Sequence, residues 1–188
     1  MFNFMDGIDG MAASEAVLVS AFAGVFLISS GQRGIAAICL ATGGAALGFL
    51  FFNWSPARIF MGDVGSGFLG FVLGTLAIAS ESGRGLGSWE WSVLLGVFLI
   101  DATLTLIRRM ANGKKWWQAH RSHAYQRAVQ SGMSHRTVTL GACLLTILLG
   151  IAARVSVLRP DSALAIGAMA LVLLLAVYAV IERAAPMR

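Results

Sequence analysis

Six apolar runs follow one another along this chain, and they decide what it can fold into. They are Ala16–Ser30, Gly34–Phe52, Val64–Ser80, Trp91–Ile107, Thr137–Ala153 and Ser162–Ile181. A helix needs about 20 residues of this kind to cross a bilayer. Hydrophobic residues make up 57% of the chain and charged residues only 12%, so a water-soluble fold would lack the polar residues to cover its surface. We predict an all-α, polytopic membrane protein with about six transmembrane helices in a single transmembrane domain, residues 1–188.

The segments between the apolar runs alternate in character. Three of them are long or rich in polar residues, namely 1–15, 53–63 and 108–136, and with six helices all three fall on the same face. Basic residues gather in the last of these segments, at Arg108, Arg109, Lys114, Lys115, Arg121, Arg127 and Arg136. Because positively charged loops remain in the cytoplasm, we predict that the three rich segments face it. The net charge of +5 therefore indicates contact with anionic membrane lipids or an anionic substrate, and not with nucleic acid.

The first rich segment contains the sequence Asn3-Phe-Met-Asp6-Gly-Ile-Asp9-Gly10. If this stretch is helical, its two carboxylates stand three residues apart and share one face. A glycine follows each of them, which allows the backbone to approach a ligand closely. The alternative is that an aspartate caps the first transmembrane helix.

The second rich segment leads into the sequence Phe60-Met-Gly62-Asp63-Val-Gly-Ser-Gly67. Asp63 stands at the entry of the third apolar run, where the helix N-terminus favours anions. A Mg²⁺ ion prefers carboxylate oxygens and often bridges substrate phosphates. The alternative is a helix cap followed by a glycine-rich packing face, in which Gly70 and Gly74 permit close contact between helices of the same chain.

The third rich segment contains the sequence His120-Arg121-Ser-His123-Ala-Tyr-Gln-Arg127. The planar fork of arginine suits phosphate oxygens. A His-x-x-His pair can also bind zinc, but this loop offers no cysteine, aspartate or glutamate, and His135 is the only other histidine. Phosphate contact is therefore favoured over a metal site, with a basic loop facing lipid headgroups as the alternative.

Two further acidic residues leave both a functional and a structural role open. Asp101 lies inside the fourth apolar run, where an ionisable group is costly and is a functional candidate by default. A structural role beside a polar cavity is the alternative. Glu15 precedes the first run and is interpreted as a first-turn carboxylate favoured by the helix dipole.

The three polar clusters resemble the signatures of one family, the polyprenyl-phosphate N-acetylhexosamine-1-phosphate transferases (glycosyltransferase family 4). Residues 3–10 resemble its N-x-x-D-G-x-D-G signature, residues 60–66 its F-M-G-D-x-G-S signature, and residues 120–127 its cytoplasmic histidine loop. Residues 101–109 are similar to the helix before that loop, so the resemblance spans nearly the whole chain. The loop sequence H-R-S-H resembles the branch that initiates bacterial O-antigen or other surface glycans.

The resemblance implies a reaction at the cytoplasmic face of the bacterial inner membrane. A UDP-N-acetylhexosamine would give its sugar 1-phosphate to undecaprenyl phosphate and release UMP. Such a transfer depends on charge neutralisation and positioning more than on covalent help from the protein. The resemblance implies Mg²⁺ as the cofactor, with Asp63 as a ligand and Asn3 beside the metal or the phosphate.

The resemblance also assigns the other polar residues of the three clusters. Asp6 and Asp9 would position the nucleotide or the metal, and Asp9 is the candidate for a uracil contact. The catalytic candidates are Asp6, Asp9, Asp63, His120 and His123. The substrate-binding candidates are Asn3, Phe60, Gly62, Arg121 and Arg127. Among these, Phe60 would stack on the uracil, and the histidine loop would contact the diphosphate or the lipid phosphate.

The family has additional N-terminal helices and an Asp-Asp motif upstream of its first signature. We therefore expect this chain to be the C-terminal part of a larger family fold. Two other hypotheses stay open, a transporter, on the strength of Asp101 and the glycine-rich third run, and a non-catalytic membrane remnant. The sequence leaves open which hexosamine is used and whether the chain forms a homodimer.

Overall fold

The computed structural model describes residues 1–81, 86–115, 117–118 and 120–187, and these residues form helices joined by short connections, with no β-strand. The elements are η1 (Phe2–Met5), α1 (Met11–Ser29), α2 (Arg33–Asn53), α3 (Gly62–Ser80), α4 (Ser88–Leu94), α5 (Gly96–Ala111), α6 (Ala124–Gln130), α7 (His135–Leu158), η2 (Pro160–Ser162) and α8 (Ala163–Ala184). The predicted all-α class is confirmed.

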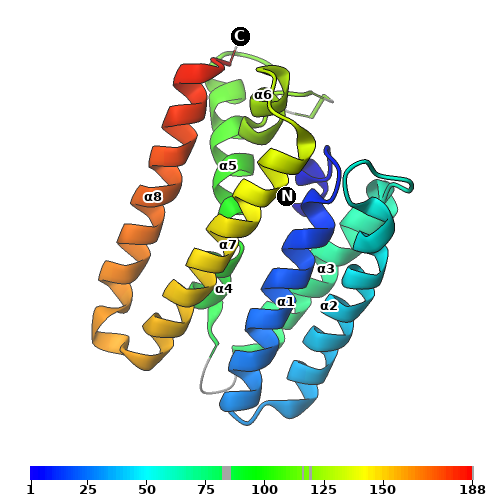
Figure 1. Ribbon diagram of the computed structural model, residues 1–188. Helices are drawn as coiled ribbons and strands as arrows, with labels where there is room; N and C mark the ends of the chain where they lie inside the picture. Colours follow the sequence, from blue (N-terminus) through cyan, green and yellow to red (C-terminus); the bar gives the residue numbers. More distant parts are fainter. Residues whose placement is uncertain (82–85, 116, 119, 188) are drawn as a thin grey trace.

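Five of these helices are long and apolar enough to cross a membrane, and a sixth span results if α4 and α5 are counted together. This agrees with the predicted number. The start of α1, the α2–α3 connection, α6 and the C-terminus all lie at one end of the bundle, the upper end in Figure 1. The three segments that carry the polar clusters therefore share one end of the molecule.

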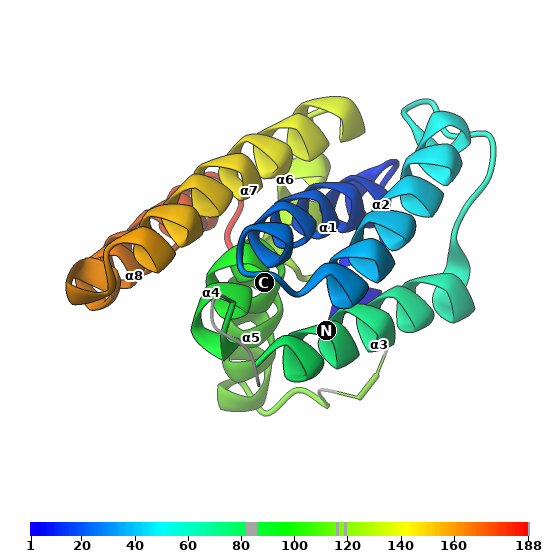
Figure 2. The same ribbon diagram turned by 90° about the horizontal axis from the view of Figure 1, so that it is seen from below.

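The α1 helix is the centre of the bundle. Figure 2 shows it with α2, α7 and the α4–α5 pair around it. Most of its apolar residues are buried, whereas α2, α3 and α8 leave most of theirs exposed, as expected of helices that face lipid. The helix begins at Met11, earlier than the predicted first span. Glu15 is therefore buried one turn inside it, where it accepts a hydrogen bond from the Thr146 hydroxyl of α7 (2.6 Å), and its interpretation as a first-turn carboxylate is wrong.

The fourth predicted span, Trp91–Ile107, is not one helix. It is divided at Leu95 into α4 and α5, whose axes differ in direction by 80°. Gly96 follows the break, and a Cβ atom there would lie 3.0 Å from Leu174 and 3.1 Å from Leu149. Leu149 of α7 and Leu174 of α8 therefore pack directly against the break. A hydropathy pattern does not indicate the break, because it does not record contacts between helices.

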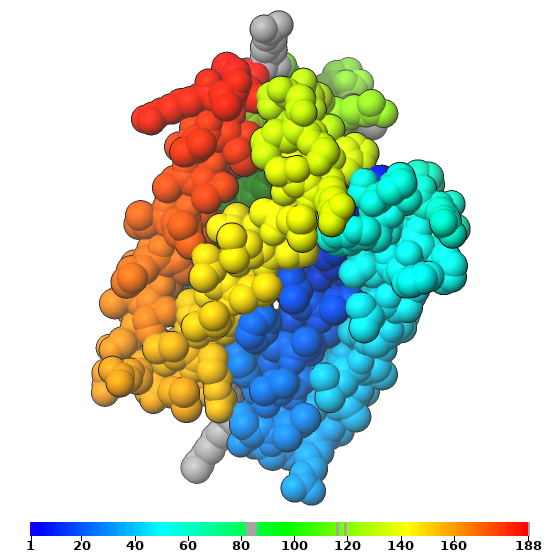
Figure 3. Space-filling model, in the orientation of Figure 1, coloured from blue at the N-terminus to red at the C-terminus, as the bar shows by residue number. Residues whose placement is uncertain are grey.

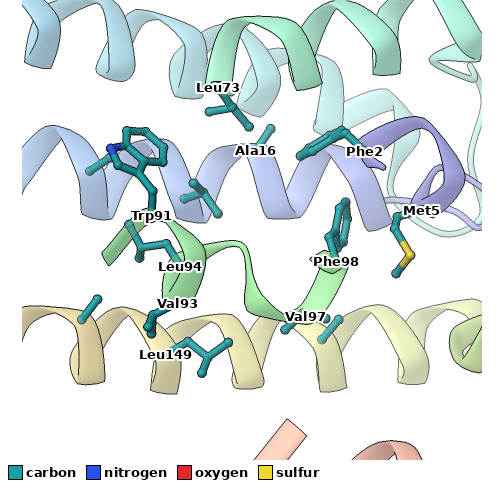
Figure 4. Close-up of a cluster of buried hydrophobic side chains, with 14 of the residues drawn as sticks. Phe2, Met5, Ala16, Leu73, Trp91, Val93, Leu94, Val97, Phe98 and Leu149 are labelled. Carbon is teal, nitrogen blue, oxygen red and sulfur yellow. The ribbon is translucent and has the colours of Figure 1, made fainter. Parts of the chain in front are cut away.

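The core beneath the polar end is made by side chains from nearly every helix, several of which are shown in Figure 4. Phe2 of η1 packs against Phe98 of α5, with ring centroids 4.9 Å apart. The Trp91 indole N–H donates to the Ser80 hydroxyl (2.8 Å), which ties α4 to the end of α3. A Cβ atom on Gly70 would lie 2.8 Å from Phe2, so this glycine allows packing within the chain.

An apolar cavity of 460 Å³ lies on the other side of α5, between α5, α6, α7 and α8. Its lining includes Val97, Leu145, Leu174 and Val177, and Met5 and Tyr125 lie at its edge toward the polar end. Figure 3 shows the face of the molecule along which α7 and α8 run. Met5 of the first cluster and Tyr125 of the third therefore contribute to this cavity, and so does Asp101 of α5.

Candidate functional site

The first two polar clusters meet at the start of α3. The Ser66 hydroxyl donates to the Asn3 side-chain oxygen (2.8 Å), which joins η1 to the first turns of α3. Asp63 lies in the first turn of α3 and is exposed. Asp6, at the end of η1, lies close enough to Asp63 for the two carboxylates to repel one another.

This arrangement changes the acidity of Asp6. Partial burial, together with the negative charge of Asp63, raises its pKa from 3.8 to about 6. Two carboxylates whose mutual repulsion shifts a pKa form a place where a cation gains free energy. The pair therefore has the electrostatic character of a cation site, although it holds only two acidic groups.

Asp9 has surroundings that differ from those of Asp6. Residues 6–10 are not helical, so Asp6 and Asp9 do not share a helix face. One Asp9 carboxylate oxygen accepts from the Ala57 amide (3.2 Å), and the other lies 3.2 Å from His135 Nδ1. Burial acts to raise the Asp9 pKa, but the Ala57 amide, His135 and Ser55 outweigh it, and the pKa falls below 3.8. Asp9 is therefore held as a carboxylate by the connection between α2 and α3 and by the start of α7.

Asn53, at the end of α2, connects the same two loops. Its side-chain oxygen accepts from the Gly10 amide (3.0 Å), and its side-chain nitrogen donates to the Ile59 carbonyl (2.8 Å). Gly10 adopts a left-handed conformation (φ 73°) and forms the N-cap of α1. The helix is thus capped without an aspartate side chain, contrary to the alternative role considered for this segment.

The histidine loop packs against the first cluster. The His123 ring is buried and stacks on Phe4, with centroids 5.9 Å apart, and on His120, with centroids 4.9 Å apart. The Tyr125 hydroxyl donates to the Phe4 carbonyl (2.9 Å). The same hydroxyl group occupies space that a Cβ atom on Gly7 would need, so this position favours glycine. The third cluster is thereby fixed to the first.

His120 is neutral at physiological pH. Burial lowers its pKa to about 4, with further contributions from the neighbouring Arg109 and His123. The Arg109 guanidinium donates to the Lys115 carbonyl (2.9 Å) and to the Ser122 hydroxyl (3.3 Å), and so holds the two ends of the loop together. A neutral imidazole can accept as well as donate a hydrogen bond.

Of the remaining candidate residues, three are exposed and one is buried and bonded to other parts of the chain. Phe60 is 75% exposed, and Gly62 (φ 68°) and Arg121 are exposed as well, so these three are open to a ligand. Arg127 is 4% exposed, and its guanidinium donates to Glu182 and to the Ala185 carbonyl of α8. The structure does not bring Arg127 to the acidic pair, and shows it joining α6 to α8.

Sequence reasoning missed several residues that build the site, among them Ser66, Asn53, Tyr125 and His135. Asn53 was detectable as the last residue of an otherwise apolar run, and Tyr125 lies within the third cluster. The partner of His135 is 126 residues away in sequence, and no local pattern indicates such a pair.

The acidic pair can be compared with what Mg²⁺ requires. Among the described residues no group of three or more histidine, cysteine, aspartate or glutamate side chains is placed to hold a metal ion. A Mg²⁺ ion commonly takes one or two carboxylates and completes its shell with waters and substrate phosphates. Asp63 is exposed, burial and Asp63 raise the pKa of Asp6, and the Asn3 side-chain oxygen, which accepts from Ser66 of α3, is a further hard ligand, so these residues fit Mg²⁺ in the presence of a phosphate substrate.

Together the fold and these contacts describe a polytopic membrane protein whose three polar clusters meet at one end. The family model described as glycosyl transferase family 4 matches residues 1–81. The probable undecaprenyl-phosphate N-acetylglucosaminyl 1-phosphate transferase of Bacillus subtilis (strain 168) is 35% identical over 153 residues, which are 80% of this chain and 43% of that protein. The phospho-N-acetylmuramoyl-pentapeptide-transferase of Clostridium perfringens (strain 13 / Type A) is 39% identical over 112 residues, 60% of this chain and 33% of that protein.

Glycosyl transferase family 4 is thus supported both by the family model and by these relatives. The matched region spans less than half the length of either relative. The family match covers the first two clusters, and the Bacillus relative extends the similarity over most of the chain.

Proposed function

We propose that this chain belongs to an enzyme that transfers N-acetylhexosamine 1-phosphate from a UDP-sugar to undecaprenyl phosphate and releases UMP. In this proposal the chain provides the residues that bind the UDP-sugar and the metal ion. The observation that carries the proposal is the convergence of three clusters from distant parts of the chain, with an acidic pair at Asp6 and Asp63 beside a histidine loop fixed onto Phe4. The names of the relatives describe transfers of this kind.

Each residue has a role that its surroundings permit. Asp63, with Asn3 and Asp6, would hold Mg²⁺, which neutralises charge on the diphosphate when bound. Phe60 is exposed and free to stack on a uracil ring. His120 and Arg121 would donate to phosphate oxygens, since a neutral imidazole and an exposed guanidinium are both available for this.

Asp9 would form a hydrogen bond with the nucleobase, and its contacts with Ala57 and His135 would fix the orientation of its carboxylate for this bond. Its carboxylate remains ionised because these partners lower its pKa, so it can accept hydrogen bonds from the imide N–H of uracil. A base contact and the two existing contacts require different lone pairs of the same carboxylate, which has about four.

The membrane setting and the wider role belong to the same proposal. The site would face the cytoplasm, because basic residues gather at its end of the bundle. The acceptor phosphate would arrive from the bilayer at the lipid interface, and the product would initiate a lipid-linked surface glycan of the O-antigen type in the bacterial inner membrane. The H-R-S-H loop sequence supports this branch.

The transporter hypothesis has lost its main support. Asp101 was its one acidic residue within a span, and both oxygens of this carboxylate are occupied by backbone amides of α6. The segments that carry the three polar clusters lie together at one end of the bundle.

Release of UMP tests the proposed function. The purified chain in detergent or nanodiscs is supplied with a UDP-N-acetylhexosamine, undecaprenyl phosphate and Mg²⁺, and UMP is measured by a coupled assay. We expect release to require both the lipid phosphate and Mg²⁺. Replacing one electrostatic group of this kind commonly costs about 100-fold in rate, so Asp63→Asn is expected to lose activity by that order.

The matched control is Asp161→Asn, which removes an exposed carboxylate from η2, at the other end of the bundle. It should leave UMP release unchanged. Equal release by wild type and Asp63→Asn would refute the metal assignment, and release without lipid phosphate would refute the transfer reaction.

A further inference from the structure

Asp101 is a buried carboxylate of α5 that lies directly behind the histidine loop. It is 7% exposed. One carboxylate oxygen accepts from the Ala124 amide (2.8 Å) and the other from the Tyr125 amide (3.1 Å). These are the first two residues of α6, so a side chain from a different helix satisfies the free N–H groups at the start of α6.

The α6 helix depends on this outside cap. Its N-cap residue, His123, makes no side-chain capping bond, although the Gln126 side chain accepts from the His123 amide (3.2 Å). The first N–H groups of any helix lack partners within it. A buried N–H group left without an acceptor destabilises the fold, so the carboxylate of Asp101 is a strong determinant of where α6 begins.

The same carboxylate lies beside the ring of His123. Its Oδ1 atom is 3.5 Å from His123 Nδ1, a buried nitrogen that makes no hydrogen bond with the described residues, and the Thr105 hydroxyl donates to that oxygen (3.0 Å) and fixes its direction. A carboxylate near Nδ1 favours the tautomer that carries hydrogen on Nδ1, which leaves Nε2 as an acceptor. The ring itself is stacked on His120 and Phe4, as described above.

From α6 the contacts continue to the first cluster. Tyr125, whose amide Asp101 binds, reaches the Phe4 carbonyl with its hydroxyl. A single carboxylate thus fixes the start of α6, the ring of His123 and, through Tyr125, the position of the loop against the first cluster. No other acidic group faces this region from α5 in the described part of the chain, while Arg109 is the cation that faces His120.

We propose that Asp101 is a positioning residue that sets the orientation and tautomer of His123. It also sets the placement of the histidine loop against the first cluster, residues 3–10. It touches no substrate. The effect on catalysis rests on the proposed function, whereas the effect on His123 does not. Asp101→Asn should disturb this arrangement, because an amide offers one acceptor and a donor where two backbone N–H groups need acceptors.

The inference is tested first without any reaction. The chain is labelled with [¹⁵N]histidine in detergent micelles, and the ring nitrogens of its three histidines are assigned with His120→Gln and His135→Gln. We expect wild-type His123 to show one protonated and one unprotonated nitrogen at distinct shifts. In Asp101→Asn these two signals should move toward a tautomer average, and in Asp161→Asn they should not move.

A second variant tests the same inference if Asp101→Asn does not fold. Thr105→Val retains the carboxylate and removes only the hydroxyl that directs Oδ1, so it should shift the His123 signals in the same direction by a smaller amount. Unchanged His123 signals in folded Asp101→Asn, or in Thr105→Val if the first variant does not fold, would overturn the inference.

Activity measurements then separate this inference from the proposed function. If both hold, Asp101→Asn lowers kcat for UMP release by about tenfold, the size of the disturbance of one charge-assisted contact, with KM for the UDP-sugar changed much less. No UMP release by wild type together with shifted His123 signals would contradict the proposed function alone. Release by wild type with unchanged His123 signals would contradict the positioning role alone.

Discussion

Asp6 and Asp9 show how far two like residues in one motif can differ. Burial and, after it, the charge of Asp63 raise the pKa of Asp6 to about 6, while the Ala57 amide and His135 lower the pKa of Asp9 against the effect of its burial. The first is suited to a cation and the second to a hydrogen-bond donor. The residues that cause the difference, Asp63, Ala57 and His135, come from other parts of the chain.

His135 should affect nucleotide binding through Asp9. Replacing His135 by alanine removes one of the partners of the Asp9 carboxylate and lets its pKa rise toward the ordinary value. A partly exposed pair of this kind contributes up to about 1 kcal/mol, so the Kd for the UDP-sugar should increase by about threefold to fivefold in His135→Ala. Isothermal titration measures this, with Arg136→Ala, the loss of the exposed neighbouring cation, as the control. A Kd changed equally by both variants would show a general charge effect.

Asp6 predicts how stability changes with pH in the absence of Mg²⁺. Its folded-state pKa of about 6 exceeds the ordinary value of 3.8, so between these values the folded state holds a proton that the unfolded state releases. Stability contributed by this group is therefore present at low pH and lost as pH rises through about 6. In EDTA at a pH well above that value, Asp6→Asn should raise the free energy of unfolding by about 1–2 kcal/mol.

Thermal unfolding of wild type and Asp6→Asn in EDTA, followed across this pH range, checks the sign. The two curves should converge at low pH, where Asp6 carries its proton in both states. A wild type that gains stability over Asp6→Asn as the pH rises would contradict the assignment. Added Mg²⁺ should reduce the difference, because a cation neutralises the repulsion from Asp63.

At the scale of elements, the break between α4 and α5 determines where the histidine loop begins. The break redirects the chain by 80°, and α5 then carries Asp101 to the start of α6. Gly96 makes the break possible, because Leu149 and Leu174 occupy the space beside it. The direction of α5 is therefore set by packing against α7 and α8.

Gly96→Leu should consequently disturb both packing and the site. Overpacking a filled core costs about 1–3 kcal/mol, and here the displaced element is α5 itself. We expect a lower unfolding temperature in detergent and reduced UMP release. Gly48→Leu, on α2, is the control, since nothing lies within 4 Å of a Cβ atom there. Equal stability of the two variants would show that Gly96 does not set the break.

At the scale of the whole molecule, the sequence predicted the features that depend on local patterns. The length of the apolar runs predicted the class and the approximate number of spans, and their alternation with polar segments predicted that the segments carrying the three polar clusters lie at one end. Motif spacing identified the residues that meet there. Each of these signals is contained within about 20 residues of sequence.

Other features depend on contacts between distant segments and were not predictable in this way. Arg127 is bound by Glu182, 55 residues further on, so its assignment to the substrate remains a prediction that its present contacts do not favour. Asp9 has its partner in α7, and the division of the fourth span follows from Leu149 and Leu174. The composition of a segment does not record what packs against it.

The proposed function requires that the acidic pair, Asp6 and Asp63, and the histidine loop form one site for a UDP-sugar. A double-mutant cycle on UDP-N-acetylhexosamine binding in Mg²⁺, with Asp63→Asn, His120→Gln and the double variant, tests it most directly. We predict that each single variant weakens binding and that their effects are coupled by more than about 0.5 kcal/mol, as expected for groups acting on one ligand. Strictly additive effects, or binding unchanged by either variant, would contradict a shared site.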